Sequence, residues 1–227
     1  MHLFCHALRV AIVLTIVLAS HCPLFADTGS SIAEDPAGSD AEIRALLHPK
    51  IDVGGLQARG PAVLPVLARL YERSDPSGRA VIAYVFYQLG WQSPDAKRVL
   101  MRDVRTRDKN LRLWVQWALG RVSGDSDVVD ALMHNMQHDL SPLFRDKAAC
   151  ALASDQIHLS ERERADLLGR VIGALRDPKI QVRVIALQVL RMHTGQKKGF
   201  NPGGAPAERD AVIQKWEAWL EEYRSQL

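Results

Sequence analysis

Two histidines, His134 and His138, have the spacing best suited to metal chemistry in this sequence. They are four positions apart, so a helix would place both imidazoles on one face, where they could bind zinc. A zinc protease would also need a glutamate next to the first histidine, where the sequence has Asn135, and no third ligand is evident. We therefore interpret the pair as a solvated helix end and expect no metal site.

Cys150 is the thiol that could serve as a nucleophile. It lies in an alanine-rich stretch, and the neighbouring small residues are Ala148, Ala149, Ala151 and Ala153. Small residues allow two helices to approach closely, so a packing role is favoured over nucleophilic catalysis. The strained G-x-S-x-G turn of serine hydrolases is also missing from the sequence.

A third candidate is the glycine-rich stretch Gly195–Gly204, which carries Lys197 and Lys198. It lacks the GK[S/T] ending of a phosphate-binding loop, and nothing before it has the pattern of a strand. We interpret it as a capping loop and expect no bound cofactor.

Composition limits the classes of function. The chain has 227 residues, of which 47% are hydrophobic and 24% charged, which suits one domain with extensions. The net charge of +3 is spread along the sequence without a long basic run, which argues against nucleic-acid binding. Apolar residues recur three and four apart, so the elements that position any site should be helices.

The N-terminus has the pattern of a secretory signal peptide. Val10–Ala19 is apolar apart from Thr15, follows Arg9, and is too short to span a membrane comfortably. We expect residues 1–26 to be cleaved after about Ala26, which places the protein in the periplasm or outside a bacterial cell. Two alternatives remain open, namely a retained anchor and a lipid on Cys22.

The next stretch, 27–40, is rich in Gly, Ser, Asp and Ala and is expected to be a flexible linker. Asp40 is predicted to cap a short helix, Ala41–His48, and Val53-Gly54-Gly55 to form a turn. After cleavage Cys150 would be the only cysteine, so the fold must depend on its core and not on disulfides.

A repeat dominates the rest of the chain. Four arginines mark it at spacings of 33, 33 and 38 residues, and they are Arg79, Arg112, Arg145 and Arg183. Such periods are typical of solenoids built from paired helices. The predicted second helices are Arg79–Leu89, Asn110–Leu119, Pro142–Ala153 and Lys179–Arg191. The first helix of the first pair begins at Gly60-Pro61, and the other first helices are Asp95–Val104, Ser126–Met136 and Glu161–Leu175.

Each predicted second helix repeats one apolar ridge. The residues three and seven positions after the arginine are all apolar, and they are Ile82, Phe86, Val115, Leu119, Ala148, Leu152, Ala186 and Leu190. Stacked hairpins bury such a ridge. A last amphipathic helix, Ala207–Gln226, is expected to cap the stack.

At the residue level, the segment AVLPVLARLYERSDPSGRAVIAYVFYQLG resembles a HEAT repeat. It has a proline in the first helix, an aspartate at the turn and an arginine early in the second helix, here Pro65, Asp75 and Arg79. The resemblance covers roughly residues 55–193. It implies an all-α, right-handed α-α solenoid of about four hairpins, with repeats in 41–193 and a capping region in 194–227.

In HEAT repeats the turn aspartate and the helix arginine also form a ladder between neighbours. Asp139/Arg145 and Asp177/Arg183 keep the expected separation of six residues. The separation is only four for Asp75/Arg79 and Asp108/Arg112, which puts the ladder in doubt there. The TGQ and GF residues of the capping loop and the W-x-x-W of the last helix resemble the tail of some bacterial exported HEAT-like proteins.

The resemblance also implies a concave groove lined by the second helices. Positions five and eight after each arginine face away from the buried ridge, which places Tyr84, Tyr87 and Trp117 in the groove, with Arg121 and Arg191 nearby. Aromatics and arginine are common binding anchors, so these five residues are the predicted partner site. Alternatively, helix 41–48 or the linker folds over the rings and makes them core.

We therefore expect a non-catalytic scaffold that binds another protein, with no cofactor or metal. One alternative is an enzyme or ligand carrier, because some HEAT-like proteins act on DNA bases or bilins. That alternative needs a buried carboxylate beside Trp117, and Asp146 is the candidate. The other alternative, if residues 1–26 are retained, is a membrane-attached structural subunit.

Overall fold

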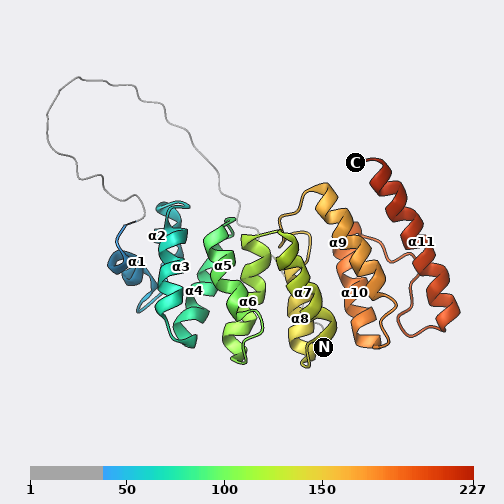
Figure 1. Ribbon diagram of the computed structural model, residues 1–227, viewed down its shortest axis with the longest axis horizontal. Coiled ribbons are helices and arrows are strands. Elements are labelled where there is room, and N and C mark those ends of the chain that lie inside the picture. Colours follow the sequence, from blue (N-terminus) through green and yellow to red (C-terminus); the bar gives the residue numbers. More distant parts are fainter. Residues whose placement is uncertain (1–37) are drawn as a thin grey trace, which may run out of the picture. The chain divides into compact units, whose positions relative to one another are not determined.

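The computed structural model describes residues 38–227, and all regular structure in that part of the chain is helical (Figure 1). The predicted signal peptide and most of the predicted linker lie outside the described residues. The helices are α1 (Asp40–Leu47), α2 (Val53–Ala58), α3 (Val63–Arg73), α4 (Pro76–Leu89), α5 (Pro94–Asp103), α6 (Lys109–Val122), α7 (Ser126–His138), α8 (Pro142–Ala151), α9 (Glu161–Ala174), α10 (Ile180–Thr194) and α11 (Pro206–Ser225).

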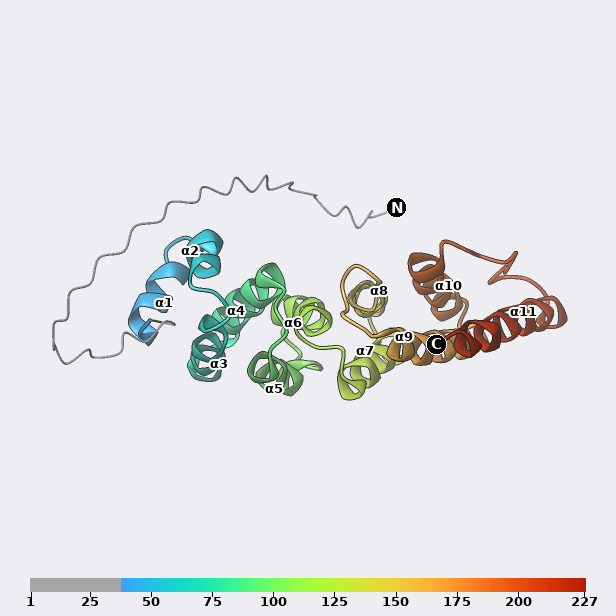
Figure 2. The same cartoon turned by 90° about the horizontal axis from the view of Figure 1, so that it is seen from above.

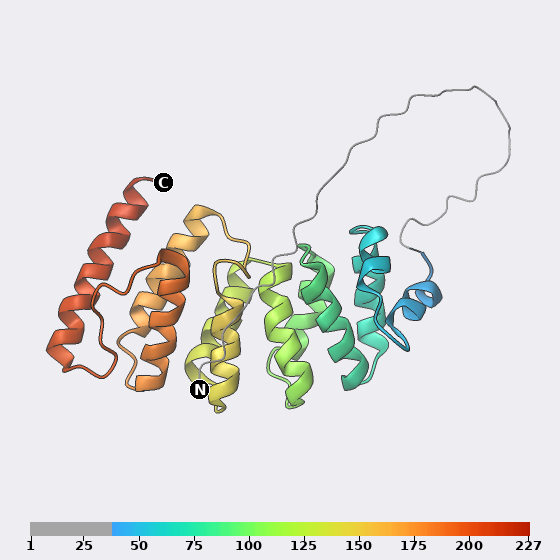
Figure 3. The same ribbon diagram turned by 180° about the vertical axis from the view of Figure 1, so that it is seen from behind.

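The helices from α3 onward stack as antiparallel hairpins in chain order, which Figure 3 shows from behind. In Figure 2 the second helices α4, α6, α8 and α10 form one layer, and the first helices α3, α5, α7 and α9 form the other. The final helix α11 continues the layer of first helices by packing on α9. The predicted all-α solenoid with a C-terminal helix is confirmed.

The predicted apolar ridge is the core of this stack. All eight of its residues are at most 2% exposed, and five of them reach 0% together with Val115. Because the same two positions are buried in every hairpin, one ridge per second helix is enough to hold adjacent hairpins together.

Most helix ends follow their capping residues. Asp75 accepts a hydrogen bond from the Gly78 amide and Pro76 occupies the first turn, so α4 begins three residues before the predicted start at Arg79. Gly90 ends α4 with φ +65°, the left-handed conformation that glycine adopts without strain.

Two predictions at the N-terminal end are wrong. Ser39, not Asp40, caps α1, and it forms a capping box with Glu42. The Val53-Gly54-Gly55 stretch is the start of α2 and not a turn. The Asp52 carboxylate accepts a hydrogen bond from the Gly55 amide at 2.9 Å, and this cap compensates for the weak helix propensity of two glycines.

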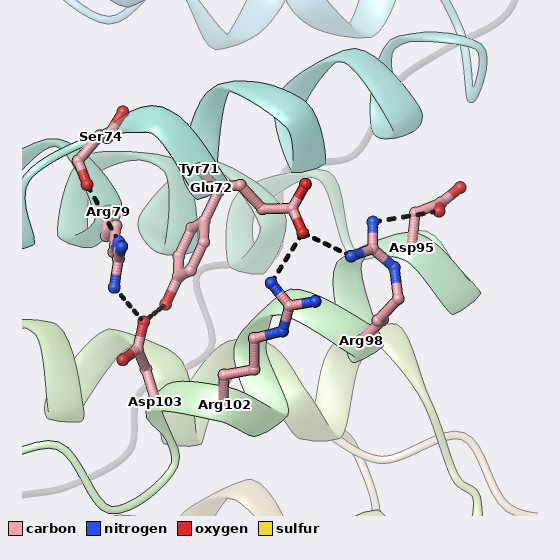
Figure 4. A network of polar contacts seen from close by, with 8 residues as sticks. All are labelled: Tyr71, Glu72, Ser74, Arg79, Asp95, Arg98, Arg102 and Asp103. Carbon is pink, nitrogen blue, oxygen red and sulfur yellow. Dashed lines mark hydrogen bonds and ion pairs between the residues drawn. The ribbon is translucent and has the colours of Figure 1, made fainter.

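The arginine ladder differs from its prediction (Figure 4). Arg79 forms an ion pair with Asp103 at the end of α5, at 3.3 Å, because Asp75 is used as a cap. The Tyr71 hydroxyl donates to the same carboxylate at 2.8 Å, and burial together with this hydrogen bond raises the pKa of Tyr71. The first rung is therefore present where the four-residue separation argued against it.

The second rung is the ion pair between Arg112 and Asp139, which joins the second hairpin to the third. The ladder ends there, although the last two pairs have the expected separation. Arg145 and Arg183 donate instead to the backbone carbonyls of their own turns, at Asp139 and Asp177. The separation of six residues thus places the arginine over its own turn, not over the next one.

Figure 4 also shows a more exposed tie between the first two hairpins. The Glu72 carboxylate accepts from Arg98 at 2.6 Å and from Arg102 at 2.8 Å. The two arginines are one turn apart on α5, so they grip one carboxylate of α3 from two positions. Since all three side chains are partly exposed, we assign this tie only a small share of the stability.

The loop after α10 fills the place that a fifth second helix would occupy. The side chain of Phe200 is 5% exposed and joins the core, and Arg183 donates from Nε to the carbonyl of Pro202 at 2.8 Å. The ammonium of Lys198 lies over the Trp216 ring at 5.0 Å and over the Trp219 ring at 5.3 Å. This loop and α11 together close the end of the solenoid.

His193 ties α10 to α8 and should make stability depend on pH. Its Nε2 lies 2.7 Å from the Leu152 carbonyl, and its buried Nδ1 has no partner among the described residues. Burial lowers the pKa of His193, and nearby Arg164 lowers it further, against the opposing effects of the Leu152 carbonyl and Asp155. Below about pH 6.5 the unfolded chain then binds a proton that the folded chain resists.

We therefore expect the free energy of unfolding contributed by this site to be complete above about pH 6.5 and to fall with decreasing pH until the folded-state pKa is passed. Urea titrations between pH 5 and 8 should show a flatter pH dependence for His193→Gln, and an unchanged one for His158→Gln at an exposed position. Equal pH dependence in wild type and His193→Gln would contradict the assignment.

Candidate functional site

Four aromatic side chains gather on the layer of second helices, and we call them the aromatic face. They are Tyr84 and Tyr87 of α4 and Trp114 and Trp117 of α6. Ring centroids are 4.8 Å apart for Tyr84 and Trp114, 5.2 Å for Tyr87 and Trp117, and 5.5 Å for the two tryptophans. All four side chains are only partly buried, so the rings form a continuous, accessible apolar surface.

Helix periodicity explains why these rings meet. Within each helix the two aromatics are three positions apart and share a face, and α4 and α6 lie side by side. The opposite face of each helix is fixed by the ridge, where Phe86 and Leu119 are 0% exposed. The predicted residues Tyr84, Tyr87 and Trp117 are thus brought together.

Trp114 was missed by the sequence argument. It lies two positions after Arg112, outside the two positions that were counted, yet it contacts three of the rings' neighbours and links α4 to α6. A signal was present, because Trp114 precedes Trp117 by three residues, which is one helical turn.

Lys147 of α8 was also missed, and it extends the aromatic face to a third helix. Its ammonium lies 5.4 Å from the centroid of the Trp117 ring, within the range of a cation–π interaction. The side chain is 15% exposed and pairs with Asp146 at 3.4 Å. Lys147 follows Arg145 by two positions, the same register that Trp114 has after Arg112.

The two predicted arginines have different positions. Arg121 packs over Gly90 at the end of α4 and donates to the Asp155 carbonyl at 3.3 Å, so it lies at the edge of the aromatic face. Arg191 is exposed near the end of α10, and within residues 38–227 it has no ring contact, hydrogen bond or ion pair with the four aromatics. The structure brings Arg121 to the site and leaves Arg191 further along the same layer.

The alternative in which helix 41–48 covers the rings differs from the observed packing. Helix α1 packs against α2 and α3, and the rings remain partly exposed. The buried residues of α1, Ile43 and Leu47, join the core at the N-terminal end of the stack. This helix therefore acts as an end cap and leaves the aromatic face open.

The enzyme hypothesis required a buried carboxylate beside Trp117. Asp146 is in the right part of α8, but its side chain is 39% exposed and ion-paired with Lys147. Water screens a carboxylate at that exposure, so Asp146 lacks the environment that tunes a catalytic acid. The geometry favours recognition by contact over proton transfer.

The remaining chemical candidates have structural roles. The rings of His134 and His138 are 4.8 Å apart on exposed α7, and desolvation with the charges of Arg105 and His138 lowers the pKa of His134. Residues 38–227 contain no group of three or more His, Cys, Asp or Glu side chains placed to hold a metal. Cys150 is 6% exposed in the tight contact of α6 and α8, where a Cβ on Gly120 would lie 2.3 Å from the Ala151 carbonyl oxygen.

The cavities of the described part lie away from the aromatic face. One of about 500 Å³ opens between α5, α7 and α9, and it is lined by Lys97, Asp125, Asp127, Glu163, Asp166 and Arg170 among others. Lys97 bridges Asp125 and Asp127 at its rim, at 2.6 and 2.8 Å. These charges pair largely with one another, which is typical of a solvated seam between hairpins.

Comparison with known proteins gives a family for part of the chain. Residues 61–153 match the family model of HEAT repeats, which includes the hairpins α3/α4, α5/α6 and α7/α8 and thus the whole aromatic face. No curated protein matches the chain. None of the helices within residues 38–227 is long and apolar enough to cross a membrane.

Proposed function

We propose that this protein, whose residues 61–153 form HEAT repeats, is a non-catalytic scaffold that binds another protein through the aromatic face. Four half-buried rings on α4 and α6 carry the proposal, because a folded chain rarely leaves so many large aromatics together on its surface without a partner. Solenoids of helical hairpins commonly present such extended surfaces for recognition. Arg121 and Lys147 at the edge would add polar contacts around an apolar centre.

The proposal includes export. It is supported by the apolar run Val10–Ala19 after Arg9 and by the small residue Ala26 at a suitable cleavage point. N-terminal sequencing of the protein from the exported fraction should give a start near Asp27. A start at Met1 would favour the membrane-attached alternative instead.

The aromatic face can be tested with a double substitution. We expect Trp114→Ala with Trp117→Ala to weaken partner binding at least about thirtyfold, because anchor residues of this type contribute about 2 kcal/mol or more. Both rings are partly exposed, so helical circular dichroism should be preserved. The measurement is a crosslinking pull-down from the exported fraction, followed by titration of the partner that it identifies.

Trp219→Ala is the matched control, because Trp219 is also partly buried but lies on α11 at the far end of the stack. Unchanged partner capture by the double variant would overturn the proposal. Loss of helical signal in that variant would show that the rings are core. A small molecule that co-purifies with wild type and is lost from the double variant would favour a ligand carrier.

A further inference from the structure

The charges beside the aromatic face have one predominant sign. Exposed or partly exposed positions of α6, α8 and α10 on this layer carry three basic residues, Arg121, Lys147 and Arg191, and one acid, Asp146. Arg121 and Arg191 have no ion pair with any residue in the described range. The surface around the rings is therefore cationic, although the whole chain has a net charge of only +3.

Lys147 retains capacity for a further carboxylate. Its only ion pair within residues 38–227 is with Asp146 at 3.4 Å, and the Asp146 side chain is 39% exposed, so water competes for that contact. The ammonium carries three donors, and one of its sides faces the Trp117 ring. A carboxylate that approached along the ring would meet both an apolar surface and a positive charge.

The contacts also have a direction. They run from Tyr84 of α4 to Trp114 and Trp117 of α6 and on to Lys147 of α8, in steps of 4.8, 5.5 and 5.4 Å. This path crosses three neighbouring helices and is at most about 16 Å long, which corresponds to about five residues of extended chain at about 3.3 Å each. An extended segment would fit it with apolar residues over the rings and an acid at the α8 end.

We propose that the aromatic face recognises an extended, acidic segment of its partner protein, in which an apolar residue or proline stacks on the rings and a carboxylate about five residues along pairs with Lys147. This inference depends on the proposed function and specifies the chemistry of the partner. Rings supply the surface and Lys147 selects the sign of charge.

The test uses the full chain and two fluorescein-labelled peptides. One has the sequence Phe-Pro-Ser-Gly-Glu-Glu and the other has two lysines in place of the glutamates. Fluorescence anisotropy should give at least about tenfold tighter binding for the acidic peptide, with an affinity that falls as salt is raised. Lys147→Glu should reverse the preference, and Lys215→Glu, the same charge change on exposed α11, should leave it unchanged.

Several outcomes would overturn the inference. They are equal binding of the two peptides, no binding of either, or an unchanged preference in Lys147→Glu. If the tryptophan double variant still loses the natural partner in those cases, the scaffold proposal survives and only the acidic specificity fails. A single-stranded oligonucleotide that binds more tightly than the acidic peptide would show that the cationic face takes a nucleic acid instead.

Discussion

Replacement of Trp216 by alanine is expected to lower the free energy of unfolding by about 3–5 kcal/mol, the usual cost of removing a buried tryptophan. Its side chain is 0% exposed between α11, α9 and the capping loop, and the Lys198 ammonium lies 5.0 Å from its ring centroid. Loss of the ring removes the surface on which the loop is seated. Phe200, 5% exposed in the same core, should then lose its enclosure.

Urea unfolding followed by circular dichroism measures this effect, and Trp219→Ala is the matched control. Trp219 is partly exposed and stacks on Tyr223 with an interplanar angle of 6°, so its removal should cost less than half as much. Equal losses for the two variants would mean that Trp216 is no keystone of the cap. A second transition that appears only in Trp216→Ala would show that the last hairpin unfolds separately from the rest.

The fold was predictable because its core is periodic. Ile82, Val115, Ala148 and Ala186 occupy the same position after each arginine, and burial of one predicts burial of all. Helix ends were less predictable, since they depend on single caps. Ser39 captures the start of α1 from Asp40, and Asp52 turns a glycine-rich stretch into α2.

The candidate site was predictable only along each helix. Tyr84 and Tyr87 followed from their register, because both positions face away from the ridge. Trp114 and Lys147 occupy another register, and their role depends on contacts between helices. Such contacts follow from the spacing and rotation of neighbouring hairpins, which the sequence of one hairpin does not specify.

The turn aspartates make the same point with opposite outcomes. Asp108 accepts a hydrogen bond from the Leu111 amide and is simply the cap of α6. Asp139 looks equivalent in the sequence, but its side chain is 1% exposed, it pairs with Arg112 of the preceding hairpin, and it accepts from the Ser141 amide at 2.9 Å. Two residues of one motif position thus have a local role and a role between repeats.

We therefore expect Asp139→Ala to lower the free energy of unfolding by about 3–5 kcal/mol, because it leaves a partly buried guanidinium without its counter-ion. Burial already lowers the pKa of Arg112, and the Phe144 ring at 4.7 Å cannot replace a carboxylate. Asp108→Ala, which removes only a cap, should cost about 1 kcal/mol.

Urea titrations of both variants provide the comparison, and Arg112→Met with Asp139→Ala completes a double-mutant cycle. If the ion pair holds the second and third hairpins together, the double variant should be more stable than Asp139→Ala alone, since it no longer buries an unpaired charge. Additive losses would instead mean that Asp139 acts through the Ser141 amide as an ordinary turn residue. In that case the stack would depend on its apolar ridge alone, and the ladder would serve only to fix the register of the first three hairpins.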